Sequence, residues 1–364
     1  MELTVWLLLV AGLALLLTGA ELLVRGASRL ALRFGISPLA IGLTVVAFGT
    51  SSPELAVSVQ SGLAGQADIA VGNVVGSNIF NVLVVLGLSA LISPLVVRQR
   101  LVRFEVPLVV GLSVLVFVMA QDGRIGLFDG VLLVGGLIAY TVLLFRQSQR
   151  EAAAVKAEYA DAFGVAAVGW LARLPMQIVF LLGGLVLLVL GSTWLVDSAV
   201  SIARALKISE AVIGLTIVAA GTSFPELATS VVAVMRGDRD IAVGNVVGSS
   251  IFNLLGILGI AALVTPGGLS VAPAMVFFDV PVMIAVAFAC LPIFATRHRI
   301  ARWEGVLFLA YYVVYVIYLI LAATQHDALD SFGSTMLGFV LPLTGVSLLV
   351  LLAQQRSRES SETQ

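Results

Sequence analysis

Charged residues are scarce in this chain of 364 residues. Asp, Glu, Lys and Arg make up 11% of it, whereas an ordinary soluble domain has about 25%. Hydrophobic residues account for 60%, and the mean hydropathy is +1.11. Such a small number of charged residues cannot cover a water-exposed surface. The composition therefore excludes a soluble globular domain and predicts a protein that crosses the membrane many times.

Cysteine and histidine are almost absent. Cys290 is the only cysteine, which excludes an intramolecular disulfide, and a small apolar role in the core suits it. The only histidines, His298 and His326, fall in expected loops. An intramembrane hydrolase needs a nucleophile with a nearby base or a histidine-bound metal, so we expect neither enzymatic activity nor a resident cofactor.

Long apolar stretches recur along the whole chain. Each is about 20 residues long, which is the length that a helix needs to cross the hydrocarbon layer of a membrane. The sequence therefore predicts an all-α membrane protein with eleven spans. They lie near residues 3–24, 37–63, 69–93, 104–120, 125–145, 175–203, 209–234, 241–264, 274–295, 303–323 and 333–353.

Lys and Arg gather on one side of this expected topology. Seventeen of the 20 fall in alternate loops, and only Arg124, Arg204 and Lys207 fall on the other side. Cytoplasmic loops carry the excess of positive charge in membrane proteins. The pattern predicts a plasma-membrane protein with its N-terminus outside and its C-terminus in the cytoplasm.

The sequence contains an internal repeat. A shift of 172 residues aligns "GLTVVAFGTSSPELAVSV" (42–59) with "GLTIVAAGTSFPELATSV" (214–231), and "DIAVGNVVGSNIFN" (68–81) with "DIAVGNVVGSSIFN" (240–253). Over residues 42–91 the two copies share 33 identities in 50 positions. Each copy covers five expected spans, and an odd number turns the second copy upside down in the membrane. A solenoid would need three or more copies and an aqueous surface.

The repeat divides the chain into two five-helix halves with additions between and after them. We expect a first repeat, a cytoplasmic connecting loop, a second and inverted repeat, an additional transmembrane helix and a cytoplasmic tail. These parts cover residues 1–146, 147–173, 174–323, 333–353 and 354–364.

Each repeat places a proline and a glutamate inside a span. Pro53 and Pro225 interrupt helical hydrogen bonding and free the carbonyl four residues earlier. Glu54 and Glu226 follow directly, although a charge at the bilayer centre costs about 2.5–3.5 kcal/mol. The surrounding helices contain no Lys, Arg or His, so a mobile cation is the simplest countercharge.

Further oxygen ligands accompany the glutamates. Ser77 and Asn81, like Ser249 and Asn253, are four residues apart and share one helical face. Hydroxyls, amides, carboxylates and freed carbonyls are hard ligands that suit Ca²⁺ and Na⁺. Competition of the two ions for one cluster is the minimum that exchange requires.

Other polar or small residues have structural interpretations. Two glycine pairs, Gly72 with Gly76 and Gly244 with Gly248, are expected to let a neighbouring backbone approach closely. Asp68 and Asp240 stand at span ends and are expected to be helix N-caps. Glu21 lies one turn from Arg25 and suggests an ion pair at the membrane surface.

The doubled GTSSPEL/GTSFPEL and GNVVGSNIFN/GNVVGSSIFN motifs resemble the two alpha repeats of the calcium/cation antiporter superfamily, specifically its bacterial sodium/calcium exchangers. The resemblance implies a ten-helix core, alternating access and a location in the bacterial inner membrane. It also implies ion ligands at matching positions: Glu54, Glu226, Thr50, Ser51, Thr222, Ser223, Ser77, Ser249, Asn81, Asn253, and the backbone carbonyls of Ala47 and Ala219. Some relatives have aspartate where Asn253 stands, which argues against potassium co-transport.

The leading functional hypothesis is a sodium-driven calcium antiporter. Its partners would be Ca²⁺, Na⁺ and the lipid bilayer, with no nucleic acid. A proton-coupled or other cation/calcium exchanger is the alternative, because carboxyl groups in an apolar site can also bind H⁺. A cation channel with acidic rings is a third possibility, although two glutamates in an inverted repeat fit alternating access better.

Overall fold

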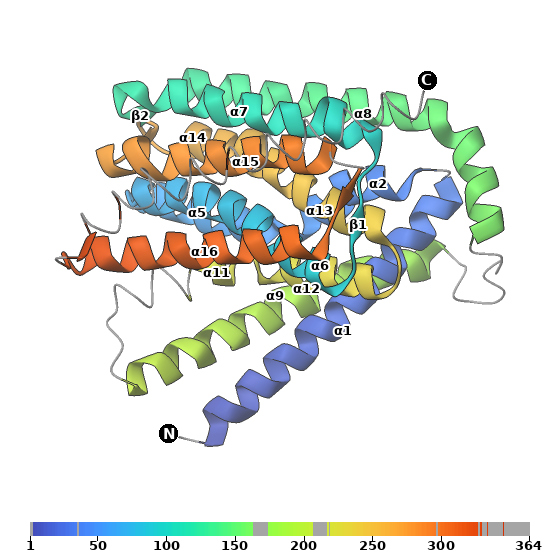
Figure 1. The fold of residues 1–364 in the computed structure, drawn as a ribbon, viewed down its shortest axis with the longest axis horizontal. Helices are drawn as coiled ribbons and strands as arrows, with labels where there is room; N and C mark the ends of the chain where they lie inside the picture. Colours follow the sequence, from blue (N-terminus) through green and yellow to red (C-terminus); the bar gives the residue numbers. More distant parts are fainter. Residues whose placement is uncertain are drawn as a thin grey trace.

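The chain folds into a bundle of helices (Figure 1). A computed structural model describes residues 3–34, 36–162, 174–206, 217, 219–295, 298–326, 328, 329, 333 and 345. Helices dominate this part of the chain because in lipid every backbone polar group must find its partner within the protein.

The first half contains two long helices at its ends and several broken or π-helical segments between them. Its elements are α1 (Leu3–Phe34), α2 (Pro38–Ile41), η1 (Gly42–Val46), α3 (Ala47–Thr50), α4 (Ser52–Leu63), α5 (Ala67–Phe80), η2 (Asn81–Leu86), α6 (Gly87–Ile92), β1 (Leu95–Val96), η3 (Leu101–Glu105), α7 (Val106–Met119), η4 (Ala120–Asp122), β2 (Arg124–Ile125) and α8 (Leu127–Ala162).

The second half has nearly the same order of elements. They are α9 (Leu174–Ala205), α11 (Ala219–Gly221), α12 (Phe224–Met235), α13 (Arg239–Phe252), η7 (Asn253–Ile257), α14 (Leu258–Val264), β3 (Leu269–Ser270), η8 (Met275–Asp279), α15 (Val280–Ala295), β4 (Arg299–Ile300) and α16 (Arg302–Ala323).

Within the described residues, eight helices are long and apolar enough to cross a membrane, or nine when the broken pair Pro38–Thr50 and Ser52–Leu63 counts as one span. They coincide with nine of the eleven predicted spans. The predicted span at 209–234 is described only in part, and its second portion is the apolar helix Phe224–Met235. The predicted span at 333–353 lies outside the described residues except for positions 333 and 345.

Helix α8 extends beyond its membrane-spanning part. The span predicted near 125–145 is confirmed as Leu127–Gln147, and the same helix continues to Ala162. The segment from 147 to 162 is rich in Ala, Glu and Lys, which are strong helix formers, so the helix continues past its apolar part. Residues 163–173 of the predicted loop lie outside the described part.

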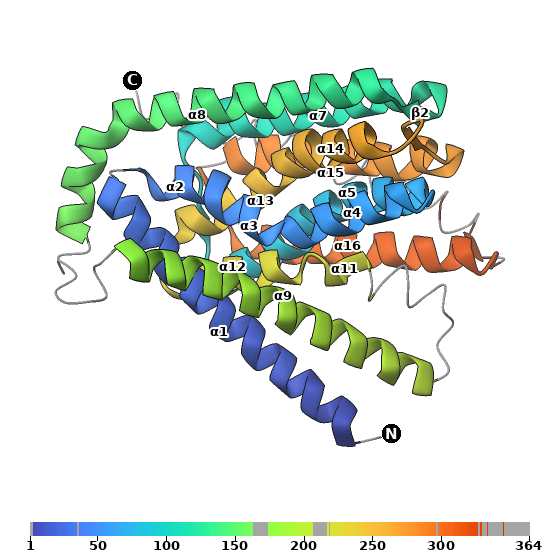
Figure 2. The same ribbon diagram turned by 180° about the vertical axis from the view of Figure 1, so that it is seen from behind.

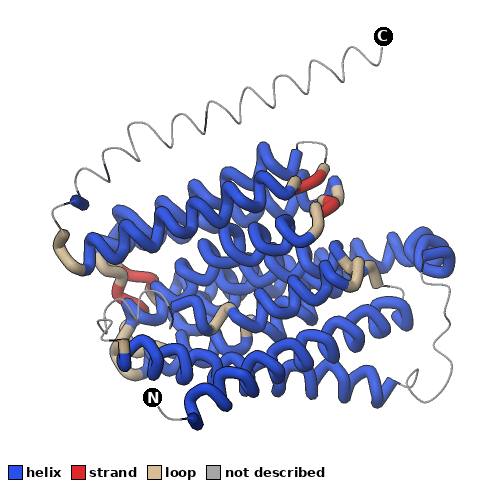
Figure 3. The backbone as a smooth tube through the Cα atoms, turned by 60° about the horizontal axis from the view of Figure 1, so that its bottom comes forward, coloured by secondary structure: helices blue, strands red, loops and turns tan. Residues whose placement is uncertain are grey.

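Short strands join the two halves at opposite ends of the bundle. β1 pairs with β4, with Leu95 opposite Ile300, and β2 pairs with β3, with Ile125 opposite Leu269. Figure 3 shows the two strand pairs at opposite ends of the molecule. β1 and β3 occupy equivalent positions in the two halves, so their location at opposite ends reflects the inversion of one five-helix repeat relative to the other.

Helices α1 and α9 pack along each other and cross the remaining helices obliquely (Figures 1 and 2). Glycines bring their backbones into contact at two levels: Gly12 meets Gly191, and Gly19 meets Gly184. A Cβ at Gly184 would lie 2.7 Å from the carbonyl oxygen of Gly19, so neither helix has room for a side chain there. These pairs preserve the 172-residue shift, because Gly12 corresponds to Gly184 and Gly19 to Gly191.

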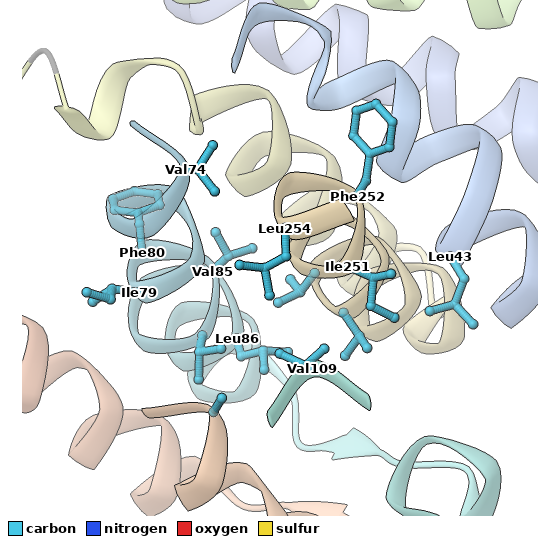
Figure 4. Packing of buried hydrophobic residues seen from close by; sticks show 14 of the residues in the cluster. Leu43, Val74, Ile79, Phe80, Val85, Leu86, Val109, Ile251, Phe252 and Leu254 are labelled. Atoms are coloured by element: carbon cyan, nitrogen blue, oxygen red, sulfur yellow. The ribbon is translucent and has the colours of Figure 1, made fainter. Parts of the chain in front are cut away.

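The apolar core lies between the two central helix runs, α5–η2 and α13–η7. Figure 4 shows Val85 and Leu254 near each other between these runs, and both side chains are fully buried. Gly244 and Gly248 bring α13 against α2 and η1: a Cβ at Gly248 would lie 2.6 Å from the Cα of Leu43. The predicted close approach is therefore confirmed for this glycine pair.

Candidate functional site

The candidate cation site begins at two helix breaks. Pro53 and Pro225 stand in the first turn of α4 and α12, and the serine two residues before each has left helical geometry, with ψ of 8° at Ser51 and 6° at Ser223. The axes of the helices before and after Ser51 differ by 45°. The prolines therefore break the spans where the sequence predicted.

The carbonyl that Pro225 releases has a side-chain donor on another helix. The hydroxyl of Ser192, on α9, donates to the Gly221 carbonyl over 2.6 Å. A carbonyl oxygen has two lone pairs and Ser192 uses one, so the prediction that this oxygen can also bind an ion stays a prediction. The repeat places Ala20 at the position that corresponds to Ser192, and alanine has no proton to donate to Gly49.

The two glutamates lie fully inside the protein. Glu54 is 1% exposed and Glu226 is 0% exposed. Each accepts a hydrogen bond from the serine of the other repeat: Ser223 donates to Oε1 of Glu54 over 3.0 Å, and Ser51 donates to Oε1 of Glu226 over 2.7 Å. The structure thus brings the two helix breaks together across the inverted repeat.

The serines of the central helices complete this arrangement. Ser77 on α5 lies 3.0 Å from the hydroxyl of Ser223, and Ser249 on α13 lies 2.9 Å from the hydroxyl of Ser51. Ser249 also approaches the carbonyl oxygen of Ala47 at 3.5 Å. Ala219, the counterpart of Ala47, is the first residue of α11.

Several buried polar atoms in this region have no hydrogen-bond partner in the described part of the chain. They include one carboxylate oxygen of each glutamate and side-chain atoms of two asparagines: Glu54 Oε2, Glu226 Oε2, both polar atoms of Asn81, and Oδ1 of Asn253. Buried polar atoms are almost always satisfied by protein, water or an ion. The unsatisfied oxygens are hard ligands, so their chemistry suits Ca²⁺ or Na⁺.

Asn81 and Asn253 lie one turn beyond Ser77 and Ser249, where α5 gives way to η2 and α13 to η7. Asn253 donates from Nδ2 to Oδ1 of Asn78 over 3.1 Å, which leaves its own oxygen available. The described residues hold no group of three or more His, Cys, Asp or Glu side chains that fits a metal. A cation here would therefore need hydroxyl, amide and carbonyl oxygens beside the two carboxylates.

Two asparagines outside the predicted ligand set contact the helix breaks. Asn73 Oδ1 accepts from the hydroxyl of Thr222, and Asn245 Oδ1 accepts from the hydroxyl of Thr50, each over 3.1 Å. Both lie in the duplicated GNVVGS string. Their exact duplication was the available signal, because nothing local requires an amide at that point of an apolar helix.

Two acidic residues near the span ends are not the expected caps. Gln66 and Asp238 occupy the N-cap positions of α5 and α13. Asp68 instead accepts from the backbone N–H of Ala272, and Asp240 pairs with Arg98 over 2.6 Å. Both bonds reach from one half of the chain to the other, so these carboxylates connect the repeats.

The predicted ion pair of Glu21 with Arg25 is confirmed, with 2.5 Å between Oε1 and Nη2. Glu21 also pairs with Arg236, which lies just after α12. Ser28, two turns along α1, donates to Asp238 over 3.0 Å. Helix α1 is thus attached by polar contacts to the turn between α12 and α13.

Comparison with known proteins agrees with this architecture. The family model of the sodium/calcium exchanger protein matches residues 4–146 and 176–321. The inner membrane protein YrbG of Escherichia coli is 38% identical over 292 residues, which are 78% of this chain and 87% of YrbG. The sodium/calcium exchanger MaX1 of Methanosarcina acetivorans is 34% identical, with 86% of this chain and 98% of MaX1 covered.

The fold also matches a solved structure. The sodium-calcium exchanger NCX_Mj, soaked with Na⁺ and Ca²⁺, superposes with a TM-score of 0.73 at 32% identity. The superposition covers 87% of this chain and 99% of that one. At that coverage the likeness extends over parts of both repeats.

Proposed function

Since this chain belongs to the sodium/calcium exchanger protein family, we propose that it is a secondary antiporter that exchanges Ca²⁺ for Na⁺ by alternating access. One observation carries the proposal: two buried glutamates each keep one carboxylate oxygen without a hydrogen-bond partner among the described residues, and the segments around them, 37–93, 219–235 and 240–264, contain no Lys, Arg or His. Ions that bind there in turn would neutralise the carboxylates before the protein changes its access.

The proposed ligands come from both repeats. Glu54 and Glu226 would hold Ca²⁺, and oxygens of the paired breaks and central helices would complete its shell of 6–8 ligands or bind Na⁺. The remaining proposed ligands are Thr50, Ser51, Thr222, Ser223, Ser77, Ser249, Asn81, Asn253 and the carbonyls of Ala47 and Ala219. The amide of Asn253 carries no charge. The proposed ligand set therefore has two carboxylates, Glu54 and Glu226, to balance the charge of its cations.

We place the protein in the bacterial inner membrane with its N-terminus outside and its C-terminus in the cytoplasm, because most Lys and Arg then lie inside. YrbG, a relative, is an inner membrane protein. In this arrangement residues 1–146 and 174–323 form the two transporting repeats. Residues 147–173 connect them on the cytoplasmic side, and 333–353 and 354–364 add a helix and a tail.

The test is isotope flux in inverted membrane vesicles that contain the protein. An imposed Na⁺ gradient should drive uptake of radioactive Ca²⁺ while pH is clamped on both sides. Vesicles from cells that lack the protein provide the blank. Calcium uptake that does not depend on Na⁺ but follows an imposed pH gradient would show that H⁺ is the driving ion. Uptake that equals the blank would overturn antiport of Ca²⁺.

A further inference from the structure

Asn73 has an orientation that its partners define. Its amide nitrogen donates to the backbone carbonyl of Glu54 over 3.1 Å and to the hydroxyl of Ser58 over 2.9 Å. A carbonyl can only accept, so the nitrogen must face Glu54 and the oxygen must face Thr222. The hydroxyl of Thr222, 3.1 Å from that oxygen, therefore donates its single proton to Asn73.

The second repeat reproduces this arrangement. Asn245 donates to the carbonyl of Glu226 over 3.3 Å and to Ser230 over 3.0 Å. Its oxygen accepts the proton of Thr50. Each asparagine thus links the glutamate-bearing helix of its own repeat to the threonine in the break of the other repeat.

Each threonine proton has a second acceptor within reach. The hydroxyl of Thr222 contacts the carboxylate of Glu54, and the hydroxyl of Thr50 contacts that of Glu226. Each of these glutamates keeps Oε2 without a partner in the described part of the chain. A hydroxyl that turned its proton to the carboxylate would present a positive hydrogen to an incoming cation and occupy a carboxylate lone pair.

We propose that Asn73 and Asn245 are positioning residues of the cation site: each accepts the threonine proton of the other repeat and so keeps that proton off the glutamate. This inference rests on the proposed antiport function. It assigns to each asparagine oxygen a role that no apolar residue of the same size can replace. The amide nitrogen has the separate task of holding the central helix against its glutamate-bearing neighbour.

A double-mutant cycle tests the inference. The variants are Asn73→Leu, Thr222→Val and the combination, and the readouts are KM for Ca²⁺ and maximal rate in sodium-driven flux. We expect Asn73→Leu to raise KM by about tenfold, the lower end of the loss typical for residues that orient a metal ligand. In the combination there is no hydroxyl proton to misdirect, so its KM should equal that of Thr222→Val alone.

Ser58→Ala is the matched control, because it removes another partner of the same amide without touching the threonine. It should leave KM within about twofold of the wild type. Gel filtration and the melting temperature of each purified variant show whether it is folded. If Asn73→Leu does not fold, Asn245→Leu with Thr50→Val supplies the equivalent cycle.

Three outcomes would overturn the inference: an unchanged KM in Asn73→Leu, multiplied effects in the combination, or an equal effect of Ser58→Ala. Failure of the proposed function is distinguishable, since it would appear as calcium uptake by the wild-type protein that does not exceed the blank. Loss of flux in Glu54→Gln together with an unchanged KM in Asn73→Leu would overturn only the role of the asparagine.

Discussion

The two repeats are alike at the site and different where the outer helices attach to it. At the site, each serine of a break bonds the glutamate of the other repeat, and each threonine bonds the other repeat's asparagine. At the periphery, α1 contacts the α12–α13 turn through Glu21 and Ser28. The comparison shows that the hydrogen bonds between the helix breaks are duplicated, while the polar contacts of α1 are not.

The mirrored positions cannot reproduce that attachment. The 172-residue shift replaces Glu21 and Arg236 by Thr193 and Ala64, which form no ion pair. In an inverted-repeat transporter the opposite access state exchanges the roles of the two repeats. The contacts of Glu21 therefore belong to one access state of the proposed cycle, and the other state must do without them.

The largest expected effect tests the likeness of the two halves. Glu54→Gln and Glu226→Gln should each lower the rate of calcium transport by at least about 100-fold, because a direct ligand matters more than the residues that orient it. The duplicated geometry predicts similar losses in initial flux and normal folding. A large loss of flux in one variant and near-normal flux in the other would contradict equivalent roles of the two glutamates.

The next effect concerns neighbouring glycines of α9. Gly184→Ala should destabilise the protein by about 1–3 kcal/mol, because the added Cβ meets the backbone of α1 at 2.7 Å. Gly183→Ala is the control, since no described atom lies within 4 Å of its Cβ, and it should be neutral or stabilising by up to about 1 kcal/mol. Melting temperatures in detergent measure both, and equal values would refute the close packing of α1 and α9.

A smaller effect tests the unlike periphery. Glu21→Gln removes the ion pairs with Arg25 and Arg236, and these side chains are partly exposed, so the loss should stay below about 1 kcal/mol. The loss should shrink further in choline chloride, a salt that screens charge without adding a transported ion. Thr193→Ala should leave the melting temperature unchanged. Equal losses in both variants would remove the asymmetry.

The smallest effect is a pH dependence at Asp238, outside the spans. Burial raises its pKa, the hydrogen bond from Ser28 and the charge of Arg236 lower it, and Asp240 raises it. A raised pKa means that the folded protein holds the proton more tightly than the unfolded one, so stability falls as pH rises through this range.

Asp238→Asn removes the buried charge and keeps an acceptor for Ser28. The variant should melt at a higher temperature than the wild type at neutral pH, by less than the change in Glu21→Gln. The difference should fade toward about pH 4, where the ordinary aspartate is itself protonated. A difference that grows as pH falls would contradict the raised pKa.

Much of the fold was predictable because the signals are local or duplicated. Apolar length predicted the spans, and Pro53 and Pro225 predicted the breaks, since the missing N–H acts within one turn. Beyond its apolar part, α8 continues because its last turns follow helix propensity rather than hydropathy. The π-helical turns at η2 and η7 depend on packing and leave no local pattern.

The residue types of the candidate site were predictable from the sequence, but the hydrogen bonds between them were not. Paired glutamates without basic neighbours indicated a cation, and the Ser–Asn spacing indicated one helical face. That Asn73 accepts from Thr222 could not be read from the sequence, because the two residues are 149 positions apart. The donor for Gly221 was missed for the same reason, since Ser192 lies on another helix.

The two strand pairs constrain how the molecule can move. Backbone hydrogen bonds connect the first repeat to the second at both ends of the bundle, where β1 pairs with β4 and β2 pairs with β3. Rotation of one repeat as a rigid body against the other would break the hydrogen bonds of both strand pairs. In the proposed cycle, a displacement of the glycine-joined helices α1 and α9 relative to the other helices would leave both strand pairs intact.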